Sequence, residues 1–219
     1  VLFHFYILKL CCEKVNPTTV FSRHKHEKAL AMGRKIVYHT DKIQKNQKER
    51  MTAMNKMETY DLLRSRSIWL EITEHKAVYN MAELADVELP YPSADAKNLF
   101  VRDDKKRNYY LITVQGDKRV NLKEFKKQHG TRSLSFASAD DLLALLGLEP
   151  GSVTPLGLLH DTEHKVQLYL DEAFLVDPGL IGVHPNDNTA TVWMKTQDLI
   201  DLLRDYGTQV HVVPVEEKG

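Results

Sequence analysis

From Met57 onward, short apolar runs alternate with polar turns along the chain. Apolar residues at every second position predict a strand, because successive side chains of a strand leave it on opposite faces. The strands expected on this basis cover residues 68–72, 166–170, 191–194 and 210–213. Two further β-rich runs, Leu99–Arg102 and Tyr109–Val114, flank a polar turn at 103–106 and predict a hairpin.

Helices are predicted where apolar residues recur at helical spacing between a capping residue and a glycine stop. The expected helices are a short one around 60–63 that starts near Glu58 or Thr59, a second at 80–85, one at 122–129 closed by Gly130, one at 139–146 between Ser138 and Gly147, and a last one from Thr196 or Gln197 to Tyr206, stopped by Gly207.

The spacing between these elements is too short for a regular series of βαβ crossovers, which need a dozen or more residues each. We therefore expect an α/β protein of the α+β type, with a mixed, largely antiparallel sheet and packed short helices. The chain of 219 residues shows no internal repeat, and its length is that of one globular domain.

Residues 1–56 differ from the rest in composition. They carry 12 basic and 4 acidic side chains, a net charge of +8, so the remaining residues carry −8 within a neutral total. The polar stretch from 22 to 56 offers little apolar surface to offset the entropy of ordering. We expect residues 1–56 to be a disordered or non-native extension and 57–219 to be the folded domain; the alternative is a basic arm that holds a nucleic acid.

Composition excludes several classes of protein. The longest apolar run, 1–12, is interrupted by His4 and Lys9, and a bilayer span needs about 20 apolar residues, so no transmembrane helix is predicted. The adjacent pair Cys11 and Cys12 provides no disulfide framework, which fits a reducing, cytosolic compartment. The start lacks the basic lead-in and cleavage site of a secretory signal.

The common cofactor motifs are missing. The chain contains no phosphate-binding G-x-x-x-x-G-K-[ST] loop, no dinucleotide G-x-G-x-x-G fingerprint and no C-x-x-C pair. His160 and His164 have the spacing of metal ligands on a helix, but they lie between two apolar, strand-like runs, 156–159 and 166–170. A hairpin turn explains this polar insert more simply than a metal site.

Three segments are candidates for a binding or catalytic site. Lys97 stands at the entrance of a strand, either as a solvated edge residue or as a cation that faces a pocket. The segment 151–157 has glycine at both ends and a proline inside, which suits either a plain connection or a stiff loop whose amides approach a ligand. His184 precedes a proline and is held extended, while Asn188 suits a turn or a substrate amide.

Together, six segments of the chain closely resemble the YbaK/prolyl-tRNA synthetase-associated editing domain family. Within this family the chain is most similar to the free-standing alanyl-tRNA(Pro) deacylases, the subfamily called ProXp-ala or PrdX. The resemblance runs from about Met57 to Val213. The segments that carry it are Tyr60-Asp-Leu-Leu63, Glu74-His-Lys-Ala-Val-Tyr79, Ala96-Lys-Asn-Leu-Phe100, Leu134-Ser-Phe-Ala-Ser138, Gly151-Ser-Val-Thr-Pro155 and His184-Pro with Asn188-Thr-Ala190.

The resemblance implies a trans-editing enzyme that hydrolyses the ester of mischarged tRNA(Pro), most of all Ala-tRNA(Pro), without a cofactor, a metal or a covalent enzyme intermediate. The implied partners are the acceptor end of the tRNA and prolyl-tRNA synthetase. The catalytic residues that it implies are Lys97, Gly151 and Ser152. The substrate-binding residues that it implies are Asn98, Val153, Thr154, Pro155, Leu156, Gly157, His184 and Asn188.

The chain departs from the family pattern at two places near the expected pocket rim. The segment 90–95 lacks the family's glycine before the lysine, and Lys76 replaces a proline after His75. Amino-acid selectivity is therefore left open, and a deacylase for a cysteine or serine ester is one alternative. A non-catalytic tRNA-binding or synthetase-associated module is another. The basic clusters 105–107 and 123–127 are either contacts for the tRNA or solvated faces.

Overall fold

The computed structural model describes residues 54–77, 89–116 and 118–218. The chain divides into two compact units, Val1–Gln47 and Lys48–Gly219, and every described residue belongs to the second. The expected division into residues 1–56 and 57–219 stays a prediction, and the helix expected at 80–85 lies outside the described residues.

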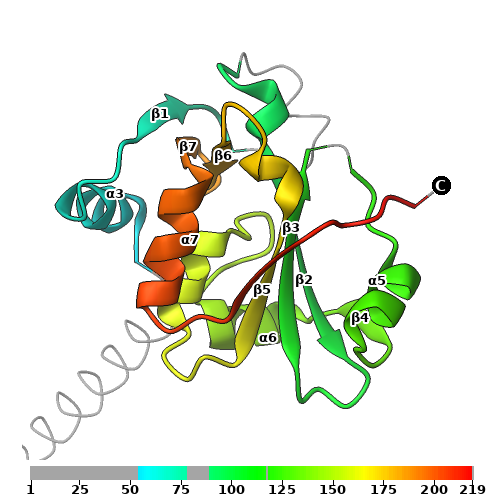
Figure 1. Ribbon diagram of the computed structural model, residues 1–219. Helices are drawn as coiled ribbons and strands as arrows, with labels where there is room; N and C mark the ends of the chain where they lie inside the picture. Colours follow the sequence, from blue (N-terminus) through cyan, green and yellow to red (C-terminus); the bar gives the residue numbers. More distant parts are fainter. Residues whose placement is uncertain (1–53, 78–88, 117, 219) are drawn as a thin grey trace, which may run out of the picture. The chain divides into compact units, whose positions relative to one another are not determined.

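The described residues form two sheets (Figure 1). The larger sheet has five strands in the order β4-β2-β3-β5-β8, and the smaller sheet has three in the order β1-β7-β6. Four of the six strand pairs are antiparallel, whereas β3 with β5 and β5 with β8 are parallel. The expected mixed, largely antiparallel α+β fold is confirmed. The strands are β1 (Glu71–Glu74), β2 (Ala96–Asp103), β3 (Tyr109–Gln115), β4 (Leu134–Phe136), β5 (Val166–Asp171), β6 (Leu180–Val183), β7 (Ala190–Lys195) and β8 (Val210–Val213).

In the described ranges of the chain, four α-helices and three short 3-10 helices pack around these sheets (Figure 1). The hairpin of β2 and β3, helix α5 with Gly130 at its end, and helix α6 between Ser138 and Gly147 are confirmed as predicted. The α-helices are α3 (Lys56–Ser65), α5 (Leu122–His129), α6 (Ala139–Leu146) and α7 (Thr196–Asp205). The 3-10 helices are η1 (Pro92–Ala94), η2 (Pro155–His160) and η3 (Glu172–Leu175).

Three expectations about local structure were wrong. Helix α3 begins earlier than expected, because Asn55 caps it and forms a reciprocal capping box with Glu58. The strand expected over 68–72 is shorter and starts only at Glu71. The apolar run 156–159 is part of η2 and not a strand, because Pro155 and the side chain of Thr154 start a helical turn there; the polar segment 160–164 is therefore not a hairpin.

Two apolar clusters lie on opposite faces of the larger sheet. Because side chains alternate along β3, Leu111 faces the cluster beneath α6, α7 and the smaller sheet, whereas Tyr110 and Ile112 face the cluster beneath α5. Val215, near the end of the chain, is buried in this second cluster. Side chains on the two faces of β2 therefore have different neighbours. The face on which a polar side chain of β2 lies decides which groups it can contact.

Candidate functional site

The register of β2 sends Lys97 and Asn98 to opposite faces of the sheet. Asn98 pairs with Thr113 across the hairpin and shares its face with the buried Phe100. Lys97 shares the other face with Leu99. The side chains of Lys97 and Asn98, two neighbouring residues that the resemblance implied, therefore lie on opposite faces of the sheet.

Asn98 joins β2 to the loop that precedes η2. Its side-chain amide donates to the carbonyl of Val153 at 3.0 Å, and its side-chain oxygen accepts from the hydroxyl of Thr113 at 2.7 Å. Both bonds fix the orientation of the Asn98 amide group. The structure thus brings the expected binding residues Asn98 and Val153 together.

The hydrogen bonds inside the loop show which of its amides are occupied. The backbone amide and the hydroxyl of Ser152 both donate to the carbonyl of Glu149, at 3.1 and 2.8 Å, so Ser152 serves a turn. The amides of Leu156 and Gly157 donate to the side chain and the carbonyl of Thr154. Proline has no amide hydrogen. The amides that have no acceptor within the described part of the chain are those of Gly151, Val153 and Thr154.

The second half of the loop is buried. Thr154, Pro155, Leu156 and Gly157 are all inaccessible to solvent and lie on or next to the larger apolar cluster. A Cβ added to Gly157 would lie 2.5 Å from Cδ1 of Leu148, so η2 packs too closely for any side chain there. This half of the loop supports the half-buried residues 151–153 and cannot itself contact a ligand without rearrangement.

The Lys97 ammonium group lies against the segment that follows β3. Its Nζ donates to the carbonyl of Lys118 at 3.4 Å, a long hydrogen bond. The side chain of Lys118 in turn pairs with the buried carboxylate of Asp171 at 2.6 Å, at the end of β5. Within the described residues the hydrogen bond of Lys97 therefore goes to Lys118 and not to the loop at 151–157.

His184 lies directly after β6 and is half-buried. A parallel bridge between Asp95 and Gly182 aligns the start of β2 with β6. Both strands continue in the same direction from this bridge, so His184 comes at the same end as Lys97. Its Nδ1 lies 3.0 Å from the carbonyl oxygen of Ala190, and its ring meets that of His75 edge-on at 6.1 Å between centroids.

Burial lowers the pKa of His184 below its usual range, and the neighbouring His75 lowers it further. The hydrogen bond to the Ala190 carbonyl and the charge of Asp187 oppose this shift but do not cancel it. His184 is therefore neutral at neutral pH.

Hydrogen bonds hold the connection between β6 and β7, which carries Asn188. Asp187 accepts from the amide of Thr189 at 2.8 Å, and the hydroxyl of Thr189 accepts from Lys56 at 3.0 Å. Lys56 also pairs with Glu74 at the end of β1. Asn188 itself is half-buried in this connection, so α3 and β1 together fix the segment in which it lies.

The turn at 160–164 lines a surface hollow of about 350 Å³ beside α6. His160 ends η2, and His164 lies on the turn with a positive φ of 52°. Within residues 54–77, 89–116 and 118–218, no group of three or more histidine, cysteine or acidic side chains is arranged to hold a metal ion. No helix of this described part is long and apolar enough to cross a bilayer.

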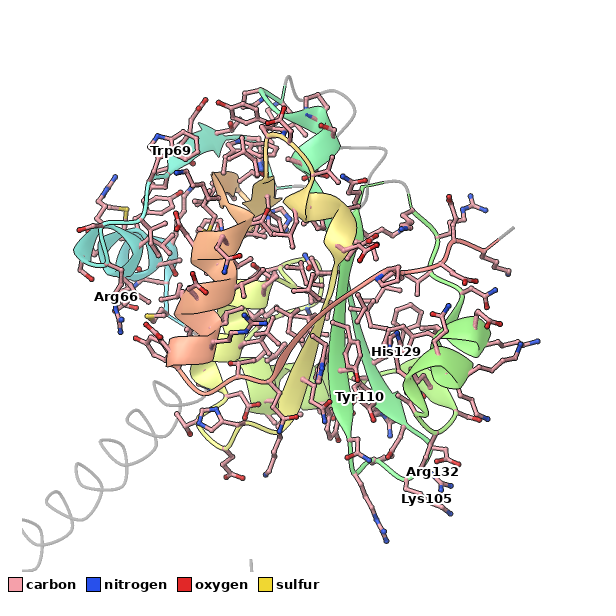
Figure 2. All side chains as sticks on the ribbon, viewed as in Figure 1. Arg66, Trp69, Lys105, Tyr110, His129 and Arg132 are labelled. Atoms are coloured by element: carbon pink, nitrogen blue, oxygen red, sulfur yellow. The ribbon has the colours of Figure 1, made fainter. Side chains whose placement is uncertain are left out.

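Exposed basic side chains gather on the hairpin end and on α5. Figure 2 shows Lys105 and Arg132 at the same end of the molecule, where Arg132 also pairs with Asp104. The exposed basic residues of this region are Lys105, Lys106, Arg107, Lys123, Lys126, Lys127 and Arg132. They form a surface that could meet phosphate groups.

Sequence reasoning did not single out four residues that organise these surroundings. Thr113 orients Asn98, Asp171 and Lys118 form the ion pair beside Lys97, and His75 contacts His184. The sequence offered one signal for Asp171, which is an acidic residue at the end of an apolar, strand-like run. The other contacts join residues that are distant in sequence, so no local pattern marks them.

Comparison with known proteins agrees with this fold. The model of the aminoacyl-tRNA editing domain matches residues 75–202. The prolyl-tRNA editing protein ProX of Acetoanaerobium sticklandii is 37% identical over 136 residues, which are 62% of this chain and 82% of that protein. The prolyl-tRNA synthetase associated domain-containing protein 1 of Mus musculus is 35% identical over 144 residues, which are 64% of this chain and 85% of that protein.

Among solved structures, one described as a proposed trans-editing enzyme for prolyl-tRNA synthetase has a TM-score of 0.55 and 22% identity, covering 77% of this chain and all of that one. At this identity the likeness concerns the fold, and it agrees with the mixed sheets and short helices of the described residues. The family model spans more than half of the chain. The chain therefore belongs to the aminoacyl-tRNA editing domain family, as the six segments of its sequence had indicated.

Proposed function

We propose that this chain is a trans-editing deacylase that hydrolyses the ester of mischarged tRNA(Pro), with Ala-tRNA(Pro) as its substrate. The observation that carries the proposal is the hydrogen bond from Asn98 to Val153, which fastens the loop at 151–157 to the strand that also bears Lys97. The family membership and the names of the relatives, which refer to prolyl-tRNA editing, support the same activity.

The reaction needs orientation and charge stabilisation more than a strong nucleophile. Water attacks the carbonyl carbon of the aminoacyl ester, and the bond from this carbon to the ribose oxygen breaks, which releases the amino acid and restores the tRNA hydroxyl. The amides of Gly151 and Val153, in the half of the loop that is not fully buried, are available to stabilise the developing oxyanion. The stiff, buried half of the loop keeps these amides in place.

Lys97 has the mobility to take part. A lysine ammonium sits on a flexible four-carbon stem, and the 3.4 Å bond to the Lys118 carbonyl is weak enough to be exchanged for a bond to a substrate oxygen. Lys97 leaves β2 on the face opposite to Asn98 and the loop, so its side chain has to turn around the end of the strand to reach a substrate held by the loop. In this proposal, it does so and binds the acyl carbonyl or the terminal adenosine of the tRNA. His184 and Asn188 shape the pocket for the amino acid.

The choice of alanine follows from the limits of size selection in the synthetase. A synthetase pocket sized for proline cannot strongly exclude a smaller apolar side chain, so an editing enzyme has a substrate wherever tRNA(Pro) is charged, in the cytoplasm. In this proposal, prolyl-tRNA synthetase is the partner that passes the mischarged tRNA(Pro) to this chain. The exposed basic residues on α5 and on the hairpin end would meet the acceptor stem.

One experiment tests both the activity and its selectivity. The protein is incubated with tRNA(Pro) charged separately with alanine, cysteine, serine and proline, and ester loss is timed against a sample without protein. The proposal expects rapid loss of the alanyl ester and little loss of the prolyl ester. Rapid loss of the cysteinyl or seryl ester alone would favour the other deacylase. No loss above background for any ester would overturn the proposal.

A further inference from the structure

His75 and His184 form a pair of imidazole rings that follow two different strands of the smaller sheet. His75 comes directly after β1, and His184 comes directly after β6. Their ring centroids lie 6.1 Å apart at an angle of 62° between the planes. In this edge-to-face arrangement, each ring limits the rotation of the other.

The hydrogen bond of His184 fixes which of its nitrogens carries the proton. Nδ1 faces the carbonyl oxygen of Ala190 at 3.0 Å. A carbonyl can only accept, so Nδ1 donates, and the neutral ring bears its lone pair on Nε2. Nε2 is then an acceptor, suited to an ammonium group and unsuited to a carbonyl or a carboxylate.

His75 uses both of its nitrogens within the protein. Its Nδ1 lies 2.8 Å from the carbonyl oxygen of Lys76 and donates to it, and its Nε2 lies 3.1 Å from the hydroxyl of Thr191 and accepts from it. Thr191 is buried on β7. The ring of His75 is therefore anchored and has no nitrogen left for a ligand, so it can act on His184 but not on a substrate.

The charged groups around His184 come from three elements. Asp187 lies on the same connection, and the ion pair of Lys56 on α3 with Glu74 on β1 lies next to Thr189. Burial disfavours a positive charge on His184 most strongly, and the neighbouring His75 adds to this effect, so the pKa of His184 is lowered despite Asp187. These surroundings keep Nε2 of His184 unprotonated at neutral pH.

We propose that His75 is a positioning residue that holds His184 as a neutral hydrogen-bond acceptor for the free α-ammonium group of the esterified amino acid. This inference deepens the proposed deacylase function and rests on it. The ammonium group is the charged hydrogen-bond donor of an aminoacyl ester, so it forms the stronger hydrogen bond to a neutral imidazole acceptor. Acetylation of the amino group weakens this contact, because the amide nitrogen is uncharged and keeps only one hydrogen to donate.

Two measurements test this inference. The first follows kcat and KM on Ala-tRNA(Pro) and on N-acetyl-Ala-tRNA(Pro). The second follows the tautomer of His184 in the protein without tRNA, by two-bond ¹H–¹⁵N correlation spectra of histidine-labelled protein. The variants are His75→Ala and, in case it folds poorly, Thr191→Val, which keeps the side-chain shape but removes the hydroxyl that anchors His75. His164→Asn, on the exposed turn, is the control.

In the wild-type protein we expect the Nδ1–H tautomer of His184 and a preference for the free amino group. His75→Ala should mix the tautomers and lower kcat/KM on Ala-tRNA(Pro) by about 10- to 100-fold, as displacement of a substrate-contacting group does. The rate on the acetylated ester should fall by a much smaller factor. Thr191→Val should have the same two effects, on the His184 tautomer and on kcat/KM, to a smaller extent. His164→Asn should have neither effect.

The outcomes separate the two proposals. In one outcome the wild-type protein hydrolyses Ala-tRNA(Pro), but the His75 and Thr191 variants keep the wild-type tautomer of His184 and the wild-type preference for the free amino group. This result would overturn the role of His75 and leave the deacylase function standing. An Nε2–H tautomer of His184 in the wild-type protein would also overturn the role of His75. If the wild-type protein hydrolyses neither ester, the proposed deacylase function is overturned, and so is the proposed contact between His184 and the ammonium group.

Discussion

The side-chain amide of Asn98 donates to the carbonyl of Val153 at 3.0 Å, although the two residues are 55 positions apart. The bond fastens a loop with two available amides, those of Gly151 and Val153, to the strand that bears Lys97. It also depends on Thr113, whose hydroxyl holds the other end of the Asn98 amide at 2.7 Å. The candidate site is therefore assembled by the hairpin of β2 and β3 and completed by the loop before η2.

Replacing Asn98 with Ala should separate the loop from the strand. The Val153 carbonyl and the Thr113 hydroxyl would lose their partner, which costs about 1–3 kcal/mol of unfolding free energy for partly buried groups. Deacylation should fall at least about tenfold, mainly in kcat, because the loop amides lose their orientation.

The matched control for this change is Asn108→Ala at the other end of the same hairpin. Asn108 donates to the buried Asp103 at 2.7 Å, so its loss also removes a hydrogen bond, but far from the loop. Urea denaturation and single-turnover kinetics of both variants distinguish the cases. Equal losses of activity in both variants would mean that only stability, and not the position of the loop, had been changed.

Gly157→Ala should destabilise the buried half of the loop. The added Cβ would come 2.5 Å from Cδ1 of Leu148, whose side chain is itself buried, so overpacking should cost about 1–3 kcal/mol of unfolding free energy. Adding Leu148→Ala to this variant makes room, and the double variant should lose less stability than the two single variants together.

Gly130→Ala provides the contrast for this prediction. Nothing lies within 4 Å of its added Cβ, but its φ of 62° strains any side chain, so a loss of about 1 kcal/mol is expected. Leu148→Ala should not change this loss. Full additivity of Gly157→Ala with Leu148→Ala in chemical denaturation would show that crowding against Leu148 is not the cause.

Stability should fall as the pH drops below about 6.5, the ordinary histidine pKa. Burial lowers the pKa of His129, His160 and His184 below 6.5. Below that pH the unfolded chain binds more protons than the folded one, so the free energy of unfolding is lost as the pH falls toward the folded-state pKa values. Urea denaturation at several pH values between about 5 and 7.5 measures this slope.

His129→Phe should reduce the slope, because it removes one of the half-buried imidazoles while keeping an aromatic ring in contact with Phe125 and Tyr169. Asn108→Ala, which removes a hydrogen bond to Asp103 but no histidine, is the control and should keep the wild-type slope. The explanation fails if the two variants show the same pH dependence.

The sequence was most informative where structure is set by local signals. Helices α5 and α6 begin and end as predicted, because Ser138, Gly130 and Gly147 act on the residues next to them. Strand β6 was missed, since its four residues become a strand through pairing with β7, where Gly182 packs directly against the ring of Trp193. The run at 156–159 has strand composition but folds as η2, because Pro155 and Thr154 start a helical turn.

The site divides in the same way. The segments that carry Lys97, Gly151–Pro155 and His184 stood out in the sequence, and their order indicated the family that comparison confirms. Which side chain of β2 meets the loop depends on the face to which each residue points, and this is set by packing. The hydrogen bonds that occupy Ser152 and anchor His75 are likewise contacts that no spacing rule predicts.

The proposed mechanism depends most directly on Lys97, and its replacement by Ala is the measurement that matters most. The rate of ester loss from Ala-tRNA(Pro) is compared in single-turnover experiments for wild-type protein, Lys97→Ala and the control Lys123→Ala on the exposed face of α5. We predict that Lys97→Ala keeps the wild-type urea denaturation curve and loses about 100-fold or more in rate. A folded Lys97→Ala variant that hydrolyses Ala-tRNA(Pro) as fast as the wild-type protein would contradict the proposed mechanism.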